Sequence, residues 1–234
     1  FSGGVDSGLL CAATSQALGG RMLAVTIQSP VDPPREQGFA RLLASQLGFA
    51  HLVIAHNDLD FPAFRANPPD RCYHCKVIRL ERLVSLAKER GIAAVLEGSN
   101  AEDDLDYRPG KRAVRELGVL SPLAEVGLLK HEIRGLARAL GLSLAERPSA
   151  PCLATRFPYG SPVTAEGLRQ VAAAEEWLLA RGYQPVRVRH HGNLARLEVA
   201  ADQITRLAAE SAAVVEHLRS LGFTYVSLDL QGYR

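Results

Sequence analysis

The chain has 234 residues, of which 47% are hydrophobic and 22% are charged, and its formal net charge at pH 7 is +2. This composition is typical of a folded globular protein and excludes a mainly disordered chain. The length allows one large domain, or a large domain with a small one. A net charge this small gives no support to a nucleic-acid partner.

The sequence contains no apolar run long enough to cross a bilayer, so we expect no membrane partner. Its four cysteines are too few for a disulfide scaffold at this length, and we expect no secretory leader. These features predict a cytoplasmic protein. The chain opens on a glycine-rich loop, which normally follows a buried strand, so we also expect the natural chain to have a strand before Phe1.

The first part of the chain alternates between strand and helix patterns. Apolar residues with helical spacing, each run ending near a glycine, predict helices over residues 8–18, 36–47, 76–90 and 130–140. Continuous apolar runs predict strands buried on both faces over residues 22–27, 51–55 and 93–96. This alternation predicts right-handed βαβ units and an α/β fold with a Rossmann-like parallel sheet. Ligands of such sheets bind beyond the carboxyl ends of the strands, here near Gln28, Gly98 and Asn100.

The intervening and later segments predict loops and a second domain. Residues 57–71 are rich in Pro and Asn and predict a loop, and residues 101–121 predict an active-site loop followed by a short helix. Residues 147–162 contain four prolines and no periodicity, which predicts a boundary between a large domain, 1–146, and a small α+β domain, 147–234. In the small domain we predict helices over 164–181 and 202–220 and strands over 186–191, 194–200 and 224–230.

The segment Ser2-Gly3-Gly4-Val5-Asp6-Ser7 leads directly into the first predicted helix. Its glycines allow the backbone to approach an anion, and the helix start offers unpaired N–H groups and the positive end of its dipole. Ser2 and Ser7 add hydroxyl donors, whereas the carboxylate of Asp6 suits a Mg²⁺ ion beside phosphates. A Walker loop would need a lysine before its final serine, and this segment has none. The competing interpretation is a turn that only caps the helix.

This segment resembles the SGGxDS loop of the PP-loop ATP pyrophosphatases. The resemblance implies that ATP is cleaved between its α- and β-phosphates, so that the acceptor receives AMP and pyrophosphate leaves. It implies a nucleotide site built from the loop and the neighbouring strand ends, namely Ser2, Gly3, Gly4, Asp6, Ser7, Gln28, Gly98 and Asn100.

Three of the four cysteines lie in polar segments. Cys72 and Cys75 form a CxxC motif in a loop just before a predicted helix, and a helix start favours the thiolate form. Cys152 lies in the proline-rich loop, whereas Cys11 lies among apolar residues and is expected in the core. The polar thiols allow four interpretations: structural cysteines, zinc ligands together with His74, ligands of a [4Fe–4S] cluster with one open iron, or Cys152 alone as a nucleophile or sulfur source.

Four further segments follow the loop: NPPDRCYHCK at 67–76, EGSNAEDDLDYRPG at 97–110, PCLATRFPYG at 151–160 and RVRHHG at 187–192. Together with the glycine-rich loop they resemble the LarE family, whose members are ATP-dependent sulfur transferases that build the nickel-pincer cofactor of lactate racemase. The resemblance covers nearly the whole chain and keeps the order of the segments.

The resemblance implies that the substrate is pyridinium-3,5-biscarboxylic acid mononucleotide. ATP would adenylate each carboxylate, and a sulfur species would then displace AMP and leave a thiocarboxylate. Some members sacrifice the sulfur of a single cysteine at the position of Cys152, and others bind a [4Fe–4S] cluster through three cysteines. Because this sequence has Cys72, Cys75 and Cys152, we predict the cluster type. We predict Cys152 and Asp6 as catalytic residues, with Asp6 also holding Mg²⁺.

Basic residues suggest where a phosphate would bind. On the predicted strand 186–191, Arg187, Arg189 and His191 share the face opposite His190. The family has its substrate-phosphate arginines in this segment, so we predict that Arg187 and Arg189, with Thr155 and Arg156, bind the phosphate of the mononucleotide. A solvated strand face is the alternative.

The remaining charged residues leave their roles open. Asp103, Asp104 and Asp106 are candidates for contacts to Mg²⁺ or to a ribose, or they form a solvated acidic loop; the resemblance favours Asp106. Lys76 and Arg71 flank the CxxC motif and either serve a phosphate or a cluster or are ordinary surface residues. Glu175 and Glu176 are solvated helix residues or, as in the family, make metal or subunit contacts.

Three other functions compete with the sulfur transferase. A tRNA thiolation enzyme shares the ATP chemistry and a three-cysteine cluster, but it should have a broad basic surface or an RNA-binding domain. An amide-forming synthetase would not need the thiols, and a nucleotide sensor could lose Asp6 and the cysteines. We expect an enzyme that binds ATP and a pyridinium mononucleotide and no nucleic acid. We also expect a homo-oligomer formed through the small domain, with the active site between the domains.

Overall fold

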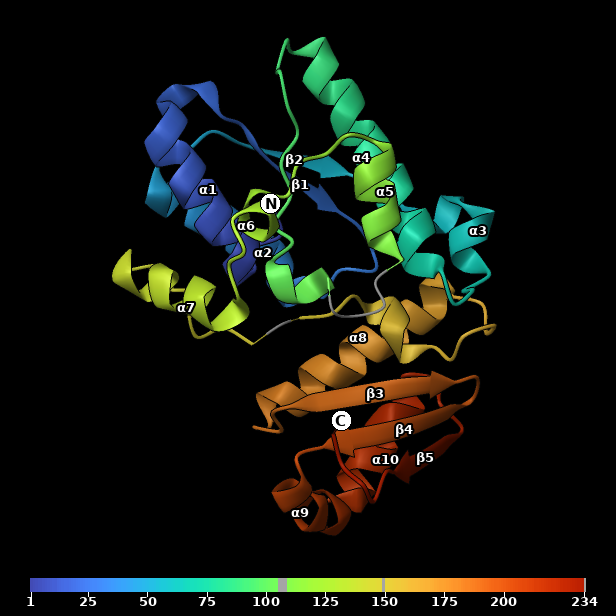
Figure 1. Cartoon of the computed structure of the whole chain (residues 1–234). Coiled ribbons are helices and arrows are strands. Elements are labelled where there is room, and N and C mark those ends of the chain that lie inside the picture. Colours follow the sequence, from blue (N-terminus) through green and yellow to red (C-terminus); the bar gives the residue numbers. More distant parts are fainter. Residues whose placement is uncertain (105–108, 149, 234) are drawn as a thin grey trace. The chain divides into compact units, whose positions relative to one another are not determined.

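The computed structural model describes residues 1–104, 109–148 and 150–233. The chain forms two compact units (Figure 1). The first unit comprises Phe1–Asp58 and Pro69–Pro151, and the second comprises Leu59–Pro68 and Cys152–Arg234. No helix in the described ranges is long and apolar enough to span a membrane.

The first unit is an α/β structure built around a parallel strand pair. β1 (Ala24–Gln28) and β2 (His51–Ala55) pair in parallel, with Ala24 opposite His51 and Gln28 opposite Ala55. The pair confirms the predicted parallel sheet. The helices of the first unit are α1 (Val5–Leu18), α2 (Pro34–Leu47), α4 (Arg71–Glu89), α5 (Gly110–Glu116), α6 (Pro122–Glu125) and α7 (Lys130–Ala139).

Two predictions about the strands were wrong. Residues 93–96 do not form a regular strand, and only Leu96 pairs in parallel, with Leu120. The partner segment is short because a turn at Gly118, with φ of 64°, precedes it and α6 begins at Pro122, which has no N–H to donate. The strands are also mostly half-buried rather than buried on both faces. Beside β1 lies an apolar cavity of about 340 Å³, which Ala24 and Val25 line together with residues of α1, α4 and the segment 92–96.

A third correction concerns the start of α4. The helix begins at Arg71, five residues before the predicted start at residue 76, so Cys72 and Cys75 lie in its first turns and not in a preceding loop. The carbonyl of Asp70 accepts hydrogen bonds from the backbone N–H groups of Tyr73 at 2.8 Å and His74 at 3.4 Å. These bonds start the helix immediately after the two prolines, 68 and 69.

The second unit packs helices on a three-stranded sheet. β3 (Val186–His191) and β4 (Leu194–Val199) are antiparallel, and β5 (Tyr225–Leu228) pairs with β4 in parallel. The helices are α3 (Pro62–Arg65), α8 (Ala165–Ala180), α9 (Ile204–Ala209) and α10 (Ser211–Ser220). The helix predicted over 202–220 is therefore divided at Glu210. The core joins α8, β3, β4 and α10 through residues such as Leu178, Val188, Leu197 and Leu218.

A buried asparagine helps to join the segment Leu59–Pro68 to the second unit. Asn67 has a left-handed backbone, with φ of 54°, and its side chain is fully buried. Its amide nitrogen donates to the carbonyl oxygens of Pro158 at 2.7 Å and Ser161 at 2.9 Å. The predicted loop 57–71 thus contains a helix and pairs with a segment almost a hundred residues later in the chain.

Candidate active site

The glycine-rich loop folds back on itself at the start of α1. Gly3 has a φ of 79°, which only glycine adopts readily, and helix α1 begins at Val5. The hydroxyl oxygens of Ser2 and Ser7 lie 3.0 Å apart, and the Ser7 hydroxyl donates to the Gly4 carbonyl at 3.2 Å. The loop therefore presents two hydroxyl groups and the amino end of a helix to the same side, an arrangement that suits phosphate oxygens.

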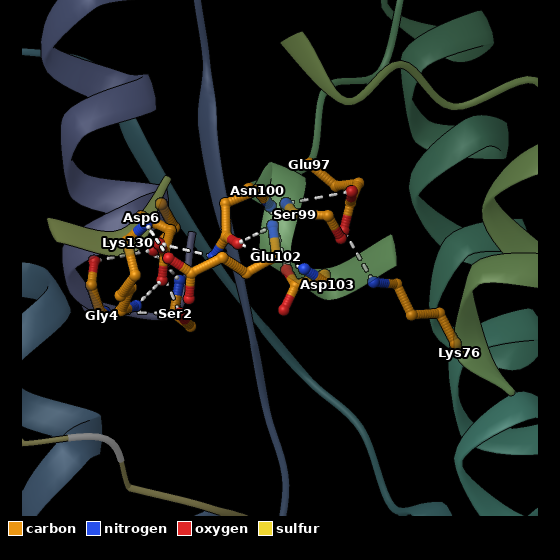
Figure 2. Close-up of a pocket in the computed structure, with 12 residues that line it drawn as sticks. Ser2, Gly4, Asp6, Lys76, Glu97, Ser99, Asn100, Glu102, Asp103 and Lys130 are labelled. Atoms are coloured by element: carbon orange, nitrogen blue, oxygen red, sulfur yellow. Dashed lines mark hydrogen bonds and ion pairs between the residues drawn. The ribbon is translucent and has the colours of Figure 1, made fainter. Parts of the chain in front are cut away.

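This loop forms one wall of a polar cavity of about 660 Å³ (Figure 2). The opposite wall comes from the segment that follows residue 96 and from the start of α7. The lining residues are Ser2, Gly4, Asp6, Ser7, Lys76, Glu97, Gly98, Ser99, Asn100, Glu102, Asp103 and Lys130. Most of the predicted nucleotide residues are thus together in one cavity, whereas Gln28 at the end of β1 is not among the lining residues; its side chain accepts a hydrogen bond from Arg41 at 3.4 Å.

Asp6 is surrounded by groups from two distant segments. Its carboxylate accepts a hydrogen bond from the Asn100 side chain at 3.3 Å and forms an ion pair with Lys130. Asn100 is fixed in turn, because its backbone N–H donates to Asp103 at 2.9 Å. Figure 2 shows these side chains converging on the loop. The Asn100 amide oxygen accepts from the backbone N–H groups of Glu102 and Asp103, so the Asp6 carboxylate is the group here that suits Mg²⁺.

Lys130 was missed in the sequence analysis. It is the first residue of α7, and its backbone N–H donates to Glu102 at 2.9 Å. A cation at the amino end of a helix opposes the helix dipole. This unfavourable position is the sequence feature that could have indicated Lys130 as a site residue, because a lysine at the amino end of a helix does not stabilise that helix.

Gly98 allows the second wall to approach the loop. A Cβ atom at this position would lie 3.0 Å from the backbone nitrogen of Ser7 and 3.1 Å from its Cα. Any larger residue would push the phosphate loop away. Beside it, Glu97 accepts hydrogen bonds from the Ser121 hydroxyl and from Lys76, the latter at 2.7 Å. Burial alone would raise the pKa of Glu97, but the charge and hydrogen bond of Lys76 outweigh burial and hold it below its usual value.

The cysteines have distinct environments. Cys72 is exposed and Cys75 is half-buried on the same side of the first turns of α4. Cys152 is half-buried and precedes a 3₁₀ turn, Leu153–Arg156, in the second unit. Cys11 is buried as predicted, and desolvation raises the pKa of its thiol.

A [4Fe–4S] cluster is compatible with the chemistry of this donor set, since Cys72, Cys75 and Cys152 are all thiols outside the core. Within the described residues, however, no three side chains of His, Cys, Asp or Glu come together as a metal-binding group. The cluster therefore stays a prediction, as does zinc binding with His74, whose ring pairs with Asp70 at 3.5 Å.

The predicted phosphate arginines of the second unit form one network. Arg156 is 1% exposed and makes two hydrogen bonds to Glu175, at 2.8 and 2.7 Å. It also donates to the Thr155 hydroxyl at 2.8 Å and to the Cys152 carbonyl at 3.3 Å. Arg189 donates to the Thr155 carbonyl at 3.0 Å. The structure thus brings Thr155, Arg156 and Arg189 together next to Cys152, and it identifies Glu175 as the buried partner of Arg156.

Arg187 differs from its neighbours. Its guanidinium donates to two neutral oxygens, the Val186 carbonyl at 3.0 Å and the Tyr233 hydroxyl at 2.9 Å. Burial and then the charge of Arg156 lower the pKa of Arg187. Arg189, by contrast, is paired with Glu198 at 2.9 and 2.8 Å, and this pairing raises its pKa. An anion at Arg187 would relieve the repulsion that it experiences.

Comparisons with known proteins identify the family of the chain. No family model matches the sequence. The chain is 37% identical over 235 residues to the pyridinium-3,5-bisthiocarboxylic acid mononucleotide synthase of Lactiplantibacillus plantarum, covering 100% of this chain and 85% of that protein. The chain belongs to the LarE family. Uncharacterised relatives include a Synechocystis protein, which is 41% identical over 100% of this chain and 88% of its own length. A Methanocaldococcus jannaschii protein is 29% identical over 100% of this chain and 89% of its own length.

For this LarE-family chain, some predicted residues stay untested. Asp106, with Tyr107 and Arg108, lies outside the described residues. Asp103 lines the cavity and is bound to Asn100, whereas Glu176 is half-buried on α8. Among solved structures, a predicted subunit of tRNA methyltransferase from M. jannaschii aligns with a TM-score of 0.37 and 22% identity, over 62% of this chain and 88% of that chain. That similarity is too low to carry an argument about this protein.

Proposed function

We propose that this protein is an ATP-dependent sulfur transferase that converts the carboxylates of pyridinium-3,5-biscarboxylic acid mononucleotide to thiocarboxylates. The observation that carries the proposal is the cavity in which the loop 2–7, Asn100 and Lys130 surround Asp6. It has the donors for a nucleotide phosphate and the carboxylate for a metal ion. The membership of the chain in the LarE family supports the choice of substrate.

In the proposed first half-reaction, a substrate carboxylate attacks the α-phosphorus of ATP, the bond to the β-phosphate oxygen breaks, and pyrophosphate leaves. The carboxylate becomes a mixed anhydride with AMP, which is a better acyl donor than the carboxylate itself. The hydroxyls of Ser2 and Ser7 and the amino end of α1 bind phosphate oxygens. Lys130 offsets the negative charge that develops on pyrophosphate. Mg²⁺ held by Asp6 would screen charge on the phosphates.

In the proposed second half-reaction, a sulfur nucleophile attacks the carbonyl carbon and AMP leaves with the bonding electrons. A [4Fe–4S] cluster on Cys72, Cys75 and Cys152 would supply transferable sulfide when bound. The alternative for the same site is that Cys152 gives up its own sulfur. In either case the contacts of Arg156 and Thr155 fix the backbone at Cys152.

We further propose that the second unit binds the phosphate of the substrate and forms the contacts of a homo-oligomer. The support for phosphate binding is the pairing pattern of its arginines. Arg187 has two neutral partners and a lowered pKa, so it gains most from a bound dianion. Arg189 and Arg156 already have carboxylate partners, and they extend the positive field around Thr155.

Product analysis tests the proposal. Purified protein with ATP, Mg²⁺ and the pyridinium substrate should release AMP and pyrophosphate only when the substrate is present. Asp6→Asn should reduce this release strongly, whereas Asp202→Asn, an exposed change in the second unit, should leave it unchanged. Release of ADP and phosphate would refute the assignment. Mass spectrometry of the protein after one turnover then separates the two sulfur sources, because loss of one sulfur from Cys152 indicates the sacrificial route.

A further inference from the structure

The two thiols of the CxxC motif differ in accessibility. Cys72 is exposed and Cys75 is half-buried. Both lie in the first turns of the 19-residue helix α4. Side chains three apart on a helix have Cβ atoms about 5–6 Å apart, and the Cβ atoms of a disulfide are about 3.5–4.5 Å apart. Joining these two sulfur atoms therefore requires the Cβ atoms to approach by about 1–2 Å through a change in the first turns of the helix.

A buried carboxylate holds the less accessible thiol. The Sγ of Cys75 donates a hydrogen bond to Oδ1 of Asp58 at 3.4 Å, and Asp58 is fully buried. Arg79 donates to both carboxylate oxygens of Asp58, at 3.1 and 2.6 Å, and the Ser29 hydroxyl donates to Oδ2. Cys75 and Arg79 are four residues apart on α4, so one helix face presents both groups to Asp58.

This arrangement has the parts of a dithiol–disulfide couple: an accessible thiol, a second thiol one turn later, and a rigid buried group that orients the second thiol. A CxxC motif at the start of a helix that follows a parallel strand pair is also typical of redox-active dithiols. We propose that Cys72 and Cys75 form a redox-active pair that exchanges electrons with low-molecular-weight disulfides. Cys72 is the attacking thiol, Cys75 is the resolving thiol, and Asp58 is a positioning residue for Cys75.

The exchange proceeds in two balanced steps. The sulfur of Cys72 attacks one sulfur of a disulfide RSSR, a Cys72–SR bond forms, and the first RS⁻ leaves and takes the proton of Cys72. The sulfur of Cys75 then attacks Cys72, the second RS⁻ leaves, and it takes the proton of Cys75. The chain loses two electrons and two protons, and RSSR becomes two RSH. In the disulfide state neither thiol is available as an iron ligand, so the couple would control when the CxxC motif can bind iron.

The test uses the full chain, freed of metal by a chelator and without ATP. The protein is equilibrated anaerobically in buffers with increasing ratios of oxidised to reduced glutathione, and its thiols are alkylated and located by peptide mass spectrometry. Cys72 and Cys75 should lose their reactivity together, at the same ratio, and an intrachain disulfide should appear. A Cys11→Ser, Cys152→Ser double variant should behave in the same way. Thiols that remain reactive at every ratio, or a bond that needs Cys152, would overturn the proposal.

Single variants test the order of the two steps. Cys75→Ser should accumulate a stable mixed disulfide of glutathione on Cys72, because the resolving thiol is missing. In the Cys11→Ser, Cys152→Ser background, Cys72→Ser should react with glutathione disulfide at least about tenfold more slowly, because its one remaining thiol, Cys75, is half-buried. The reverse pattern would contradict the assigned roles.

A further variant tests the positioning role. Asp58→Asn should lengthen the lifetime of the mixed disulfide about tenfold without changing the rate of its formation, whereas Glu81→Gln, an exposed change on α4, should change neither rate. If the mixed disulfide of Asp58→Asn has the same lifetime as that of the wild type, Asp58 does not position Cys75. These measurements need neither substrate nor cluster, so their failure is distinct from a failure of the proposed sulfur transfer.

Discussion

Replacing Glu175 by alanine should strongly destabilise the second unit. Glu175 is 4% exposed and is the carboxylate partner of Arg156, which is 1% exposed. The substitution removes the carboxylate that balances a buried guanidinium, whose remaining acceptors include the neutral Cys152 carbonyl and Thr155 hydroxyl. It also removes the acceptor of the Val188 backbone N–H, which donates to Glu175 at 3.0 Å. Breaking a buried ion pair by removing one partner costs about 3–5 kcal/mol.

The cost can be measured by urea unfolding. With a slope of about 2 kcal/mol per molar urea, a loss of about 3–5 kcal/mol lowers the midpoint by about 1.5–2.5 M. The chain has one tryptophan, Trp177, and it packs against the core of the second unit, so its fluorescence reports the unfolding of that unit. The matched control is Glu176→Ala at the half-buried neighbouring position, with an expected effect within about 0.5 kcal/mol. Equal midpoints for the two variants would refute the reasoning.

Three further outcomes follow from the first unit. Gly98→Ala should reduce AMP release about tenfold or more, because its Cβ would meet the backbone of Ser7 at 3.0 Å; Gly135→Ala, with nothing within 4 Å, should leave AMP release unchanged. Lys130→Met should reduce AMP release by about 10²-fold, with Lys130→Arg less affected, and equal rates for both would argue against a charge effect. The pKa of Asp58 lies below its usual value because the hydrogen bond and charge of Arg79 outweigh burial, so its contribution to stability is present above about pH 4 and is lost as the pH falls below that value. Circular dichroism during urea unfolding should therefore show a difference between the wild type and Asp58→Asn that is largest at neutral pH and shrinks in acid.

Local pattern was sufficient to predict most of the elements. The strand at residues 51–55 and the strand at residues 186–191 were predicted with their observed bounds, because continuous or alternating apolar residues mark a strand within a few positions. The glycine-rich loop at the start of α1 could also be predicted from a local signal, because its glycines, serines and aspartate are adjacent in sequence. The prediction at residues 93–96 failed because pairing depends on a distant partner, and the segment at Leu120 offers only one bridge.

Long-range polar contacts could not be predicted from sequence. Lys130 reaches Asp6 across more than a hundred residues, and Asn67 joins its segment to Pro158 and Ser161. Neither contact has a periodic signal, because each depends on how the helices pack. The resemblance to the LarE family identified the cysteines and arginines, but it did not indicate that Arg156 is bound to Glu175 or that Cys75 is bound to Asp58.

Both half-buried cysteines are thus next to an arginine that makes two hydrogen bonds to one buried carboxylate. Cys75 donates to Asp58, which is held by Arg79, and the Cys152 carbonyl accepts from Arg156, which is held by Glu175. Buried ion pairs add little net stability, because desolvation offsets most of their attraction. Their presence beside these two cysteines is therefore better explained by positioning than by stability.

The double variant Arg156→Met, Glu175→Leu separates these two explanations. Replacing a complete buried pair by apolar residues of similar size is often neutral or stabilising by about 1–4 kcal/mol, but Glu175→Leu also removes the acceptor of the Val188 backbone N–H, which costs about 1–3 kcal/mol. This variant should therefore unfold close to the urea midpoint of the wild type and well above that of Glu175→Ala. It should still lose sulfur transfer, because Cys152 and Thr155 no longer have their shared donor. The adenylation step, whose ATP-binding groups lie in the first unit, should be retained at saturating pyridinium substrate, because the proposed part of Arg156 in binding the substrate phosphate affects adenylation only through substrate affinity. A double variant as unstable as Glu175→Ala would show that the pair is needed for folding, whereas one that keeps full sulfur transfer would show that Arg156 does not position Cys152.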